Sequence, residues 1–426
     1  MIHVDKMDSL LTEKVKISAS GLTPFLNYKF ELRLHSSNGI LRSYCILKSD
    51  DHGKIDLTSA KPIRGTYLEP DPMGLFMTVE RTDDVSYGDM IKNFEGEPFF
   101  YSLRLFSESE ELLDEVNLKK RWHHPLVAEI EVKQGGIWGV IYKPPGPGPF
   151  PCIIDTPVLS GRLCKTHAPL FASEGFLSFC FPMLDEPRLP KTLEDVNIEY
   201  LSHIKYVQSL PYCSDKIGLY GISFAGTIAH HLATKHPELK AVATTNGPGA
   251  FYREKGYIRE NGRPIECETL DSSLTVTENG VVKQKAIFSD LIGRLRPATI
   301  IKWKKISTNI PFRVLSSIDD WLVDGVTNGA YIRDNLLKTG HKVEVRPHSL
   351  PNALQQTIQI EFVNSGHVMV IPYIPHHDFG YNKFLNVNLA FGGDTCTHGK
   401  VQETAWEKHI HFFKNHLGAT KKIAGL

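Results

Sequence analysis

The sequence lacks an excess of charge of either sign, with 48 lysine and arginine residues against 48 aspartate and glutamate residues. A protein that binds mainly nucleic acid carries surplus lysine and arginine to neutralise phosphates, so we do not expect nucleic acid as the partner. The chain also lacks a run of about 20 apolar residues, which a membrane-spanning helix requires. The segment Met1–Ser20 contains charged side chains where a secretory signal would be apolar. We therefore expect an intracellular protein without a membrane span.

Cysteine is scarce and scattered, with seven residues and no Cys-x-x-Cys pair. An odd, widely spaced set indicates reduced thiols rather than a disulfide framework. We expect the cytoplasm, with the peroxisome as the alternative, because the final residues Ala424-Gly425-Leu426 only partly resemble a peroxisomal Ser-Lys-Leu signal. There is also no His-Glu-x-x-His motif, and we expect neither a metal nor another cofactor.

What the chain does contain is enough apolar sequence for sizeable cores, since 41% of its 426 residues are hydrophobic. Its first part favours β-structure. Short runs of β-branched and aromatic residues lie at Val15–Ser18, Tyr28–Leu34, Leu41–Lys48 and Phe99–Phe106, with turn residues between them. Such spacing is typical of a β-sandwich. We predict an N-terminal β-sandwich domain over residues 1–132.

From about residue 133 onward, expected strands alternate with expected helices. The strands are Val140–Tyr142, Cys152–Asp155, Leu177–Phe181, Lys216–Tyr220, Ala241–Thr245, Phe312–Ser316 and Lys342–Arg346, and the helices are Leu193–Leu210, Thr227–Lys235, Ala330–Lys338 and Trp406–His416. This alternation predicts an α/β domain over residues 133–426, with a mostly parallel sheet and helices on both faces. Residues 256–308 fit least well and contain an expected hairpin at Asn279-Gly280. We interpret them as an insertion that could cover an active site.

The sharpest motif is Gly221-Ile222-Ser223-Phe224-Ala225, which lies between an expected strand and an expected helix. Small residues on both sides of a serine allow the abrupt turn of a nucleophile elbow, the hallmark of an α/β-hydrolase. Ala225 stands where glycine is usual, and it is small enough. The sequence therefore predicts Ser223 as the nucleophile of a serine hydrolase, with the Phe224 amide as one oxyanion donor. The second donor is expected within residues 157–161.

In an α/β-hydrolase the acid and then the histidine follow the serine along the chain. Asp320 comes just after the expected strand Phe312–Ser316, with Asp319 as the alternative acid. His367 follows Ser365-Gly366, small residues that allow its loop to bend back over the serine. We therefore predict catalytic roles for Ser223, Asp320 and His367. Competing histidines are His123, His124, His376, His377, His409 and His411.

Several motifs together resemble the family of type-I acyl-CoA thioesterases and bile acid-CoA:amino acid N-acyltransferases. They are Pro72-Met73-Gly74-Leu75, Pro147-Gly148-Pro149-Phe150-Pro151, Leu189-Pro190-Lys191-Thr192, Gly221-Ile222-Ser223, Asn246-Gly247, Ser365-Gly366-His367 and the closing segment Phe412–Gly418. The likeness covers nearly the whole chain and places the family's catalytic serine, aspartate and histidine on Ser223, Asp320 and His367. Departures are Phe224-Ala225 for Lys-Gly, Ser317 for glycine in the acid loop, and about a dozen extra residues at 347–360.

The resemblance implies a long-chain fatty acyl-CoA substrate, hydrolysed to free acid and CoA. For the CoA phosphates, basic candidates are Arg162, Lys165, Arg188 and Lys191. The N-acyltransferase branch, which conjugates acyl groups to glycine or taurine, is the alternative; it typically has a cysteine nucleophile, so a serine favours water as acceptor. Further alternatives are a carboxylesterase and a non-catalytic lipid-binding protein on the same scaffold, since a fold does not fix a function.

Overall fold

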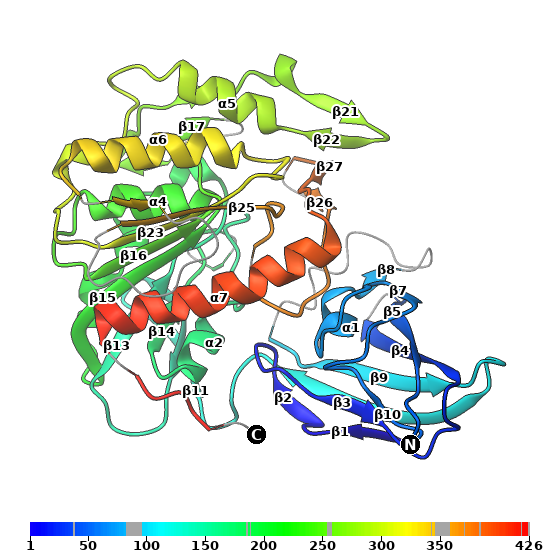
Figure 1. Cartoon of the computed structure of the whole chain (residues 1–426). Coiled ribbons are helices and arrows are strands. Elements are labelled where there is room, and N and C mark those ends of the chain that lie inside the picture. Colours follow the sequence, from blue (N-terminus) through cyan, green and yellow to red (C-terminus); the bar gives the residue numbers. More distant parts are fainter. Residues whose placement is uncertain are drawn as a thin grey trace.

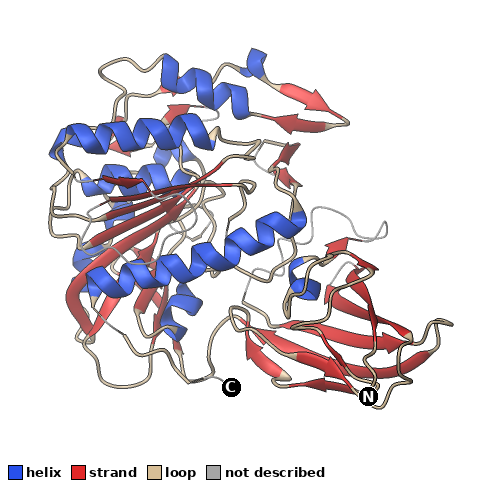
Figure 2. Cartoon of the chain, viewed as in Figure 1, coloured by secondary structure: helices blue, strands red, loops and turns tan. Residues whose placement is uncertain are grey.

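The computed structural model describes the chain except for residues 37–38, 82–95, 185, 188, 254–257, 342, 346–357, 370, 383–384, 419 and 425–426. Figure 1 shows two parts: a smaller β-rich part from the N-terminal third and a larger part with a central sheet. Figure 2 shows that nearly all long helices belong to the larger part.

Two sheets form the N-terminal part. Its strands are β1 (Ile2–Val4), β2 (Asp8–Leu10), β3 (Ile17–Ala19), β4 (Asn27–Ser36), β5 (Gly39–Lys48), β6 (Ile55–Asp56), β7 (Arg64–Gly65), β8 (Glu80–Arg81), β9 (Phe99–Phe106) and β10 (Leu112–Arg121). One sheet has the order β2-β10-β9-β4-β5-β7, with β8 beside β5, and the other is β1-β3-β6. Ile17 of the small sheet and Phe30 and Leu103 of the large one share a hydrophobic core. The predicted β-sandwich is therefore confirmed.

The larger part is built on a sheet of order β11-β12-β14-β13-β15-β16-β23-β25-β24. Its strands are β11 (Ala128–Gln134), β12 (Ile137–Lys143), β13 (Phe150–Asp155), β14 (Leu177–Cys180), β15 (Cys213–Ile222), β16 (Ala241–Thr245), β23 (Phe312–Ser317), β24 (Val343–Val345) and β25 (Ile358–Val363). β11 and β12 are antiparallel, and all pairs from β14 onward are parallel. β11 spans the predicted domain boundary at residue 132.

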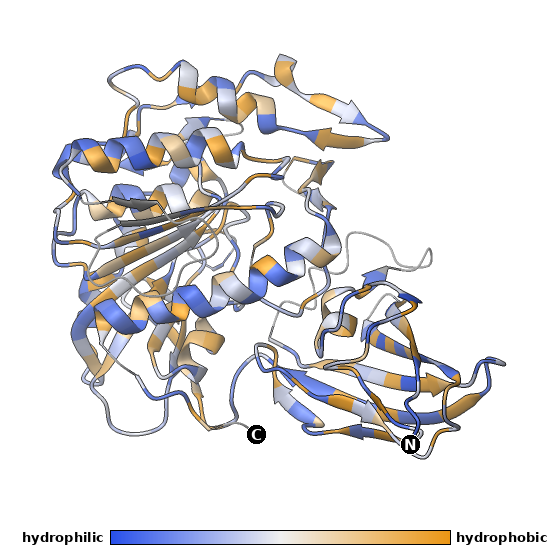
Figure 3. Cartoon of the chain, viewed as in Figure 1, coloured by the Kyte–Doolittle hydropathy of each residue, from blue (hydrophilic) through white to orange (hydrophobic). Residues whose placement is uncertain are grey.

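Helices cover both faces of this sheet (Figure 1). α2 (Ala168–Ser173) and α7 (Thr395–Leu417) lie on one face, and α4 (Phe224–Ala233) and α6 (Gly325–Lys338) on the other. Neighbouring strand residues serve opposite cores, because side chains alternate along a strand: Tyr220 packs with the α7 core and Leu219 with the α4 core. Hydrophilic and hydrophobic segments alternate along α7 (Figure 3). The predicted α/β-hydrolase class is confirmed.

One predicted helix is wrong, and one strand of the sheet was not predicted. Leu193–Leu210 is not one helix but three short pieces, η2 (Leu193–Asp195), η3 (Tyr200–Ser202) and α3 (Ile204–Gln208). The cause is pairing with the insertion, since Arg259 N–H donates to Val196 O and Ile198 N–H donates to Arg259 O at 2.8 Å each. The strand β25 was not predicted; it comes directly before His367 along the chain and lies between β23 and β24 in the sheet. The extra residues expected at 347–360 thus end in the inner strand β25, next to the edge strand β24.

The insertion has secondary structure of its own. It contains β18 (Arg259–Glu260), β19 (Arg263–Pro264), β20 (Glu268–Thr269), η4 (Ser272–Leu274), β21 (Val276–Glu278), β22 (Val281–Lys283), α5 (Lys285–Gly293) and η5 (Trp303–Lys305), and β17 (Tyr252–Arg253) precedes it. β21 and β22 form the predicted hairpin, with φ 50° at Asn279 and 75° at Gly280. β22 also pairs with β27 (Val387–Ala390), which pairs with β26 (Phe379–Asn382). The insertion is thereby joined to the chain that follows His367.

Candidate active site

Ser223 lies in a tight turn between β15 and α4. Its backbone has φ 56° and ψ −130°, a conformation that few non-glycine residues adopt. A Cβ atom at Gly221 would lie 2.5 Å from the Ala225 carbonyl oxygen, so glycine is required before the serine. The Ser223 N–H donates to the Thr245 carbonyl at 2.8 Å and ties the turn to β16. The predicted strand-to-helix turn is present, with Ser223 at the carboxyl end of β15.

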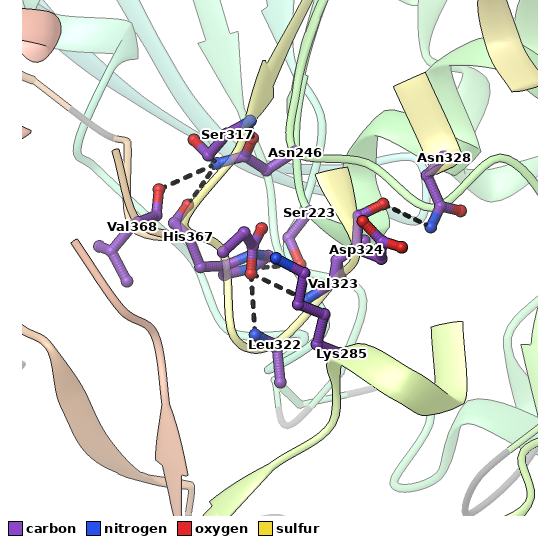
Figure 4. Close-up of polar contacts among 12 residues, drawn as sticks. Ser223, Asn246, Lys285, Ser317, Leu322, Val323, Asp324, Asn328, His367 and Val368 are labelled. Carbon is purple, nitrogen blue, oxygen red and sulfur yellow. Dashed lines mark hydrogen bonds and ion pairs between the residues drawn. The ribbon is translucent and has the colours of Figure 1, made fainter. Parts of the chain in front are cut away.

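The Ser223 hydroxyl, the His367 ring and the Asp320 carboxylate form one hydrogen-bonded chain. Ser223 Oγ lies 3.0 Å from His367 Nε2 (Figure 4), and His367 Nδ1 lies 2.7 Å from Asp320 Oδ2. Because a carboxylate accepts, this geometry assigns the ring proton to Nδ1 and leaves Nε2 to accept the serine proton. Asp320 is 0% exposed and His367 5%. The structure brings together the three side chains that the sequence singled out.

The Asp320 carboxylate is held by the backbone of its own loop. Leu322 and Val323 N–H both donate to Oδ1 at 2.8 Å, which leaves Oδ2 for His367. Asp319 points elsewhere, and its Oδ2 accepts from the Gly393 N–H at 3.0 Å. Of the two candidate acids, Asp320 is therefore the one in contact with the histidine.

Two of the competing histidines have other partners. His376 Nε2 donates to the Gly393 carbonyl at 3.0 Å, and His409 Nδ1 accepts from Arg313 Nε at 3.1 Å. Burial lowers the pKa of both rings below the ordinary histidine value, so both rings are neutral near pH 7. Their role is to hold backbone and buried charge in place.

The loop that carries His367 is fixed by α7 and by a glycine turn. A Cβ atom at Gly366 would lie 2.0 Å from the Gly392 carbonyl oxygen, so this contact requires glycine. His398 of α7 accepts from the Gly366 N–H through Nδ1 and donates to the Val368 carbonyl through Nε2, both at 3.1 Å. Burial lowers the pKa of His398 well below its usual value, which keeps the ring in the neutral form that this pattern needs.

Asn246 is a buried residue whose role sequence reasoning missed, since it entered only as part of a family motif. Its Nδ2 donates to Ser317 Oγ at 2.9 Å, to the His367 carbonyl at 2.8 Å and to the Gly366 carbonyl at 3.3 Å (Figure 4). Its Oδ1 accepts from the Ser317 N–H at 2.7 Å. The Asn246 amide thus joins the end of β16, the end of the acid strand and the histidine loop. Its position at the carboxyl end of β16 is the signal that could have found it.

The oxyanion donors were predicted at Phe224 and within residues 157–161. Phe224 is the first residue of α4, so its N–H has no partner within the helix. In the predicted second segment, Pro157 has no N–H, and the Gly161 N–H donates to the Val158 carbonyl at 2.9 Å. The N–H groups of residues 158–160 are therefore the remaining candidates there.

The basic residues suggested for CoA phosphates lie in different surroundings. Lys165 Nζ is paired with Glu129 at 2.6 Å, whereas Arg162 and Lys191 are exposed. Arg188 lies outside the described residues. Over the part of the chain that the structure describes, no group of histidine, cysteine and acidic residues could hold a metal ion, and no helix is both long and apolar enough to span a bilayer.

The chain is similar to named proteins along nearly its whole length. It is 26% identical over 419 residues to the peroxisomal succinyl-coenzyme A thioesterase of Mus musculus, covering 97% of this chain and 95% of that protein. It is 25% identical to acyl-coenzyme A thioesterase 1 of Rattus norvegicus, covering 95% and 94%. It is 23% identical to the bile acid-CoA:amino acid N-acyltransferase of Mus musculus, covering 96% of each. Among solved structures, a putative dienelactone hydrolase from Klebsiella pneumoniae matches with 14% identity and a TM-score of 0.38, over 67% of this chain and 97% of that one.

Two family models match the chain. Residues 12–134 match the acyl-CoA thioester hydrolase/BAAT N-terminal region. Residues 196–419, more than half of the chain, match the BAAT/acyl-CoA thioester hydrolase C-terminal region. The resemblance drawn from the sequence motifs is thereby confirmed, and so is the prediction of an enzyme that acts on thioesters. The chain belongs to the family of acyl-CoA thioester hydrolases and BAAT-type enzymes.

Proposed function

We propose that this enzyme hydrolyses long-chain fatty acyl-CoA thioesters through a Ser223–His367–Asp320 triad and an acyl-enzyme. The observation that carries the proposal is the hydrogen-bonded chain from Ser223 Oγ to His367 Nε2 at 3.0 Å and from His367 Nδ1 to Asp320 Oδ2 at 2.7 Å. A serine is a weak nucleophile at neutral pH, and a correctly oriented histidine is what activates it. The family's relatives named as acyl-coenzyme A thioesterases support the substrate class.

In the first half-reaction Ser223 Oγ attacks the thioester carbonyl carbon while His367 Nε2 takes the serine proton. Asp320 stabilises the resulting imidazolium, and the amides of Phe224 and of one residue in 158–160 donate to the oxyanion. The carbon–sulfur bond then breaks, CoA leaves with the proton, and the acyl group remains on Oγ as an ester. In the second half-reaction water attacks this ester and loses a proton to His367. The carbon–oxygen bond breaks, Ser223 regains the proton, and the free acid leaves.

The second candidate function is transfer of the acyl group to an amino acid. It is favoured by the similarity to a bile acid-CoA:amino acid N-acyltransferase over 96% of each chain. The two functions share the first half-reaction and differ only in whether water or an amine attacks the ester. The serine nucleophile favours water.

We also propose a division into domains at residues 1–132 and 133–426, and a cytoplasmic location.

The test is incubation of the purified chain with palmitoyl-CoA, with release of the CoA thiol followed over time and the acyl product identified by mass spectrometry. We expect thiol release with free palmitate as product, and loss of both in Ser223→Ala. Repeating the reaction with glycine or taurine separates the candidates, since acyl-glycine or acyl-taurine would identify the transferase. Absence of thiol release from every acyl-CoA would contradict both and leave a carboxylesterase or a non-catalytic lipid-binding protein.

A further inference from the structure

The loop that buries Asp320 exposes an aromatic side chain on its outer face. Trp321 is 36% exposed, whereas Asp320, the residue before it, is 0% exposed. Because the two residues are consecutive, their Cα atoms are about 3.8 Å apart, and the tryptophan lies next to the acid that holds His367. A tryptophan exposed to this extent offers a flat apolar face to a ligand, and this one lies beside the proposed reactive site.

Trp321 is held rigidly in this exposed position. Its carbonyl accepts from the N–H groups of Gln284 at 3.0 Å and Lys285 at 3.1 Å, where α5 begins. Its indole edge packs on Gly392, because a Cβ atom there would lie 2.2 Å from Cδ1. The ring is therefore fixed before any ligand arrives, which reduces the entropy cost of binding.

Two lysines lie against this ring. Lys283 Nζ is 4.3 Å and Lys285 Nζ 5.7 Å from the ring centroid. Lys285 Nζ also donates to the Ile318 carbonyl at 2.9 Å, and Figure 4 shows Lys285 beside the loop of Leu322 and Val323. Trp321, Lys283 and Lys285 together form what we term the Trp321 platform. It combines a flat aromatic surface with two cationic groups at the edge of the candidate active site.

This combination fits one end of coenzyme A. The nucleotide end of that molecule has a purine ring, which stacks on aromatic side chains, and phosphates, which bind ammonium groups. We propose that the Trp321 platform is the subsite for the phosphorylated adenosine of coenzyme A. This inference rests on the proposed acyl-CoA substrate. The Lys283 ammonium moves off the indole face, the purine takes its place there, and Lys283 and Lys285 bind the phosphates.

Acidic neighbours do not prevent this. Glu278 Oε2 pairs with Lys283 Nζ at 2.6 Å, but the Glu278 side chain is 59% exposed. Exposed ion pairs contribute little, so a phosphate can replace this carboxylate. Asp324 accepts from the Thr327 N–H at 3.3 Å and caps α6, so its carboxylate already has a structural partner.

The direct test is calorimetric titration of the full chain with adenosine 3′,5′-bisphosphate, which contains no thioester. We expect saturable binding to the wild-type chain and roughly ten-fold weaker binding to Trp321→Ala, the loss that one stacked base accounts for. Trp321→Phe keeps an aromatic ring and should fall between the two, which separates stacking from misfolding. Lys283→Met should weaken binding and reduce its dependence on salt. No binding to the wild-type chain, or equal affinity in Trp321→Ala, would overturn the proposal.

Trp138 on β12 provides a matched control, because it also has a lysine above its ring: Nζ of Lys133, on the neighbouring strand β11, is 5.9 Å from the centroid. Trp138→Ala should bind the bisphosphate as the wild type does.

A second measurement compares kcat/KM for lauroyl-CoA and lauroyl-pantetheine. Trp321→Ala should lower the preference for CoA by the same factor as it weakens the bisphosphate, and an unchanged preference would contradict the assignment. If neither thioester is hydrolysed while the bisphosphate still binds, the proposed hydrolysis fails and the subsite stands.

Discussion

The two parts of the molecule differ in the kinds of side chain that they bury. The N-terminal sheets bury mainly apolar side chains, such as Phe30, Leu32 and Leu103. The larger part instead gathers buried polar residues at the carboxyl ends of neighbouring strands, where Asn246 and Asp320 are 1% and 0% exposed. A buried polar group is costly unless it is fully hydrogen-bonded, so such a cluster requires an exact arrangement. The N-terminal part is thus stabilised mainly by apolar packing, whereas the larger part holds the proposed catalytic side chains in position.

The two parts meet along α7. The Asp71 carboxylate pairs with Lys400 of this helix, and the Cys396 thiol donates to the Thr66 carbonyl at 3.4 Å. A Cβ atom at Gly399 would lie 2.9 Å from Met77 Cβ, so helix and sandwich are in close contact. The same helix holds the histidine loop through His398. The N-terminal part thus supports the end of the helix that supports His367.

The largest effect expected within the polar cluster comes from the acid. Asp320→Asn keeps the shape but favours the wrong tautomer of His367, and in other triads this change lowers kcat about ten-thousand-fold. Asp319→Asn is the matched control, because it changes the neighbouring carboxylate, which accepts from the Gly393 N–H, while Asp320 keeps its bond to His367. It should retain most activity. Steady-state kinetics with palmitoyl-CoA measure both, and a larger loss in Asp319→Asn would transfer the acid role to Asp319.

A smaller loss is expected at Asn246. Asn246→Ala removes the amide that holds the His367 carbonyl and Ser317, and a misplaced catalytic group typically costs about a hundred-fold in rate. We expect kcat to fall and KM to change little, since the amide faces the loops and not the substrate. Asn27 is the control from the sandwich, where its side chain donates to Glu108 at 3.0 Å on the surface. Asn27→Ala should match the wild type, and equal kcat in Asn246→Ala would refute the positioning role.

Acid should destabilise the larger part. Burial lowers the pKa of His203 to about 4 and of His230 to about 3, and the pKa of His398 well below its usual range. The unfolded chain binds protons at an ordinary pKa of about 6.5, so it holds more protons than the folded chain below that pH. Stability therefore falls as pH drops from about 6.5 toward 4. Thermal unfolding over that range measures it, and a melting temperature independent of pH would contradict these neutral, buried rings.

The sandwich has a weaker pH dependence, in a different range. Lys120 is 1% exposed, and burial lowers its pKa to about 7, while its Nζ donates to the Leu10 carbonyl at 3.1 Å. The unfolded lysine keeps its proton up to about pH 10.4. Between pH 7 and that value the unfolded chain binds more protons, so stability rises with pH. Urea unfolding should show this rise in the wild type and a smaller one in Lys120→Met. An equal rise in stability in both proteins would show that groups other than Lys120 cause it.

Local patterns predicted the fold class and many of the elements, and also the tight turn at Ser223, because Gly221 and Ala225 carry that turn in the sequence itself. The choice between Asp319 and Asp320 could not be made, since it depends on which carboxylate the Leu322 and Val323 amides reach. β25 was missed because Glu361, which lies in this inner strand, pairs with Arg313 at 2.9 Å and breaks the apolar run expected of a buried parallel strand. The features that the sequence did not predict depend on contacts between segments distant in sequence, or on which of two adjacent loop residues faces the histidine.

The central claim is that Ser223 is the nucleophile, and fluorophosphonate labelling followed by peptide mass spectrometry tests it most directly. We predict one modified serine, in the peptide that contains Gly221-Ile222-Ser223, and no modification in Ser223→Ala. Labelling should be much slower in Asp320→Asn, because the reagent reacts only with an activated serine. A label on another residue, or an unlabelled Ser223 in the folded wild-type chain, would contradict the claim.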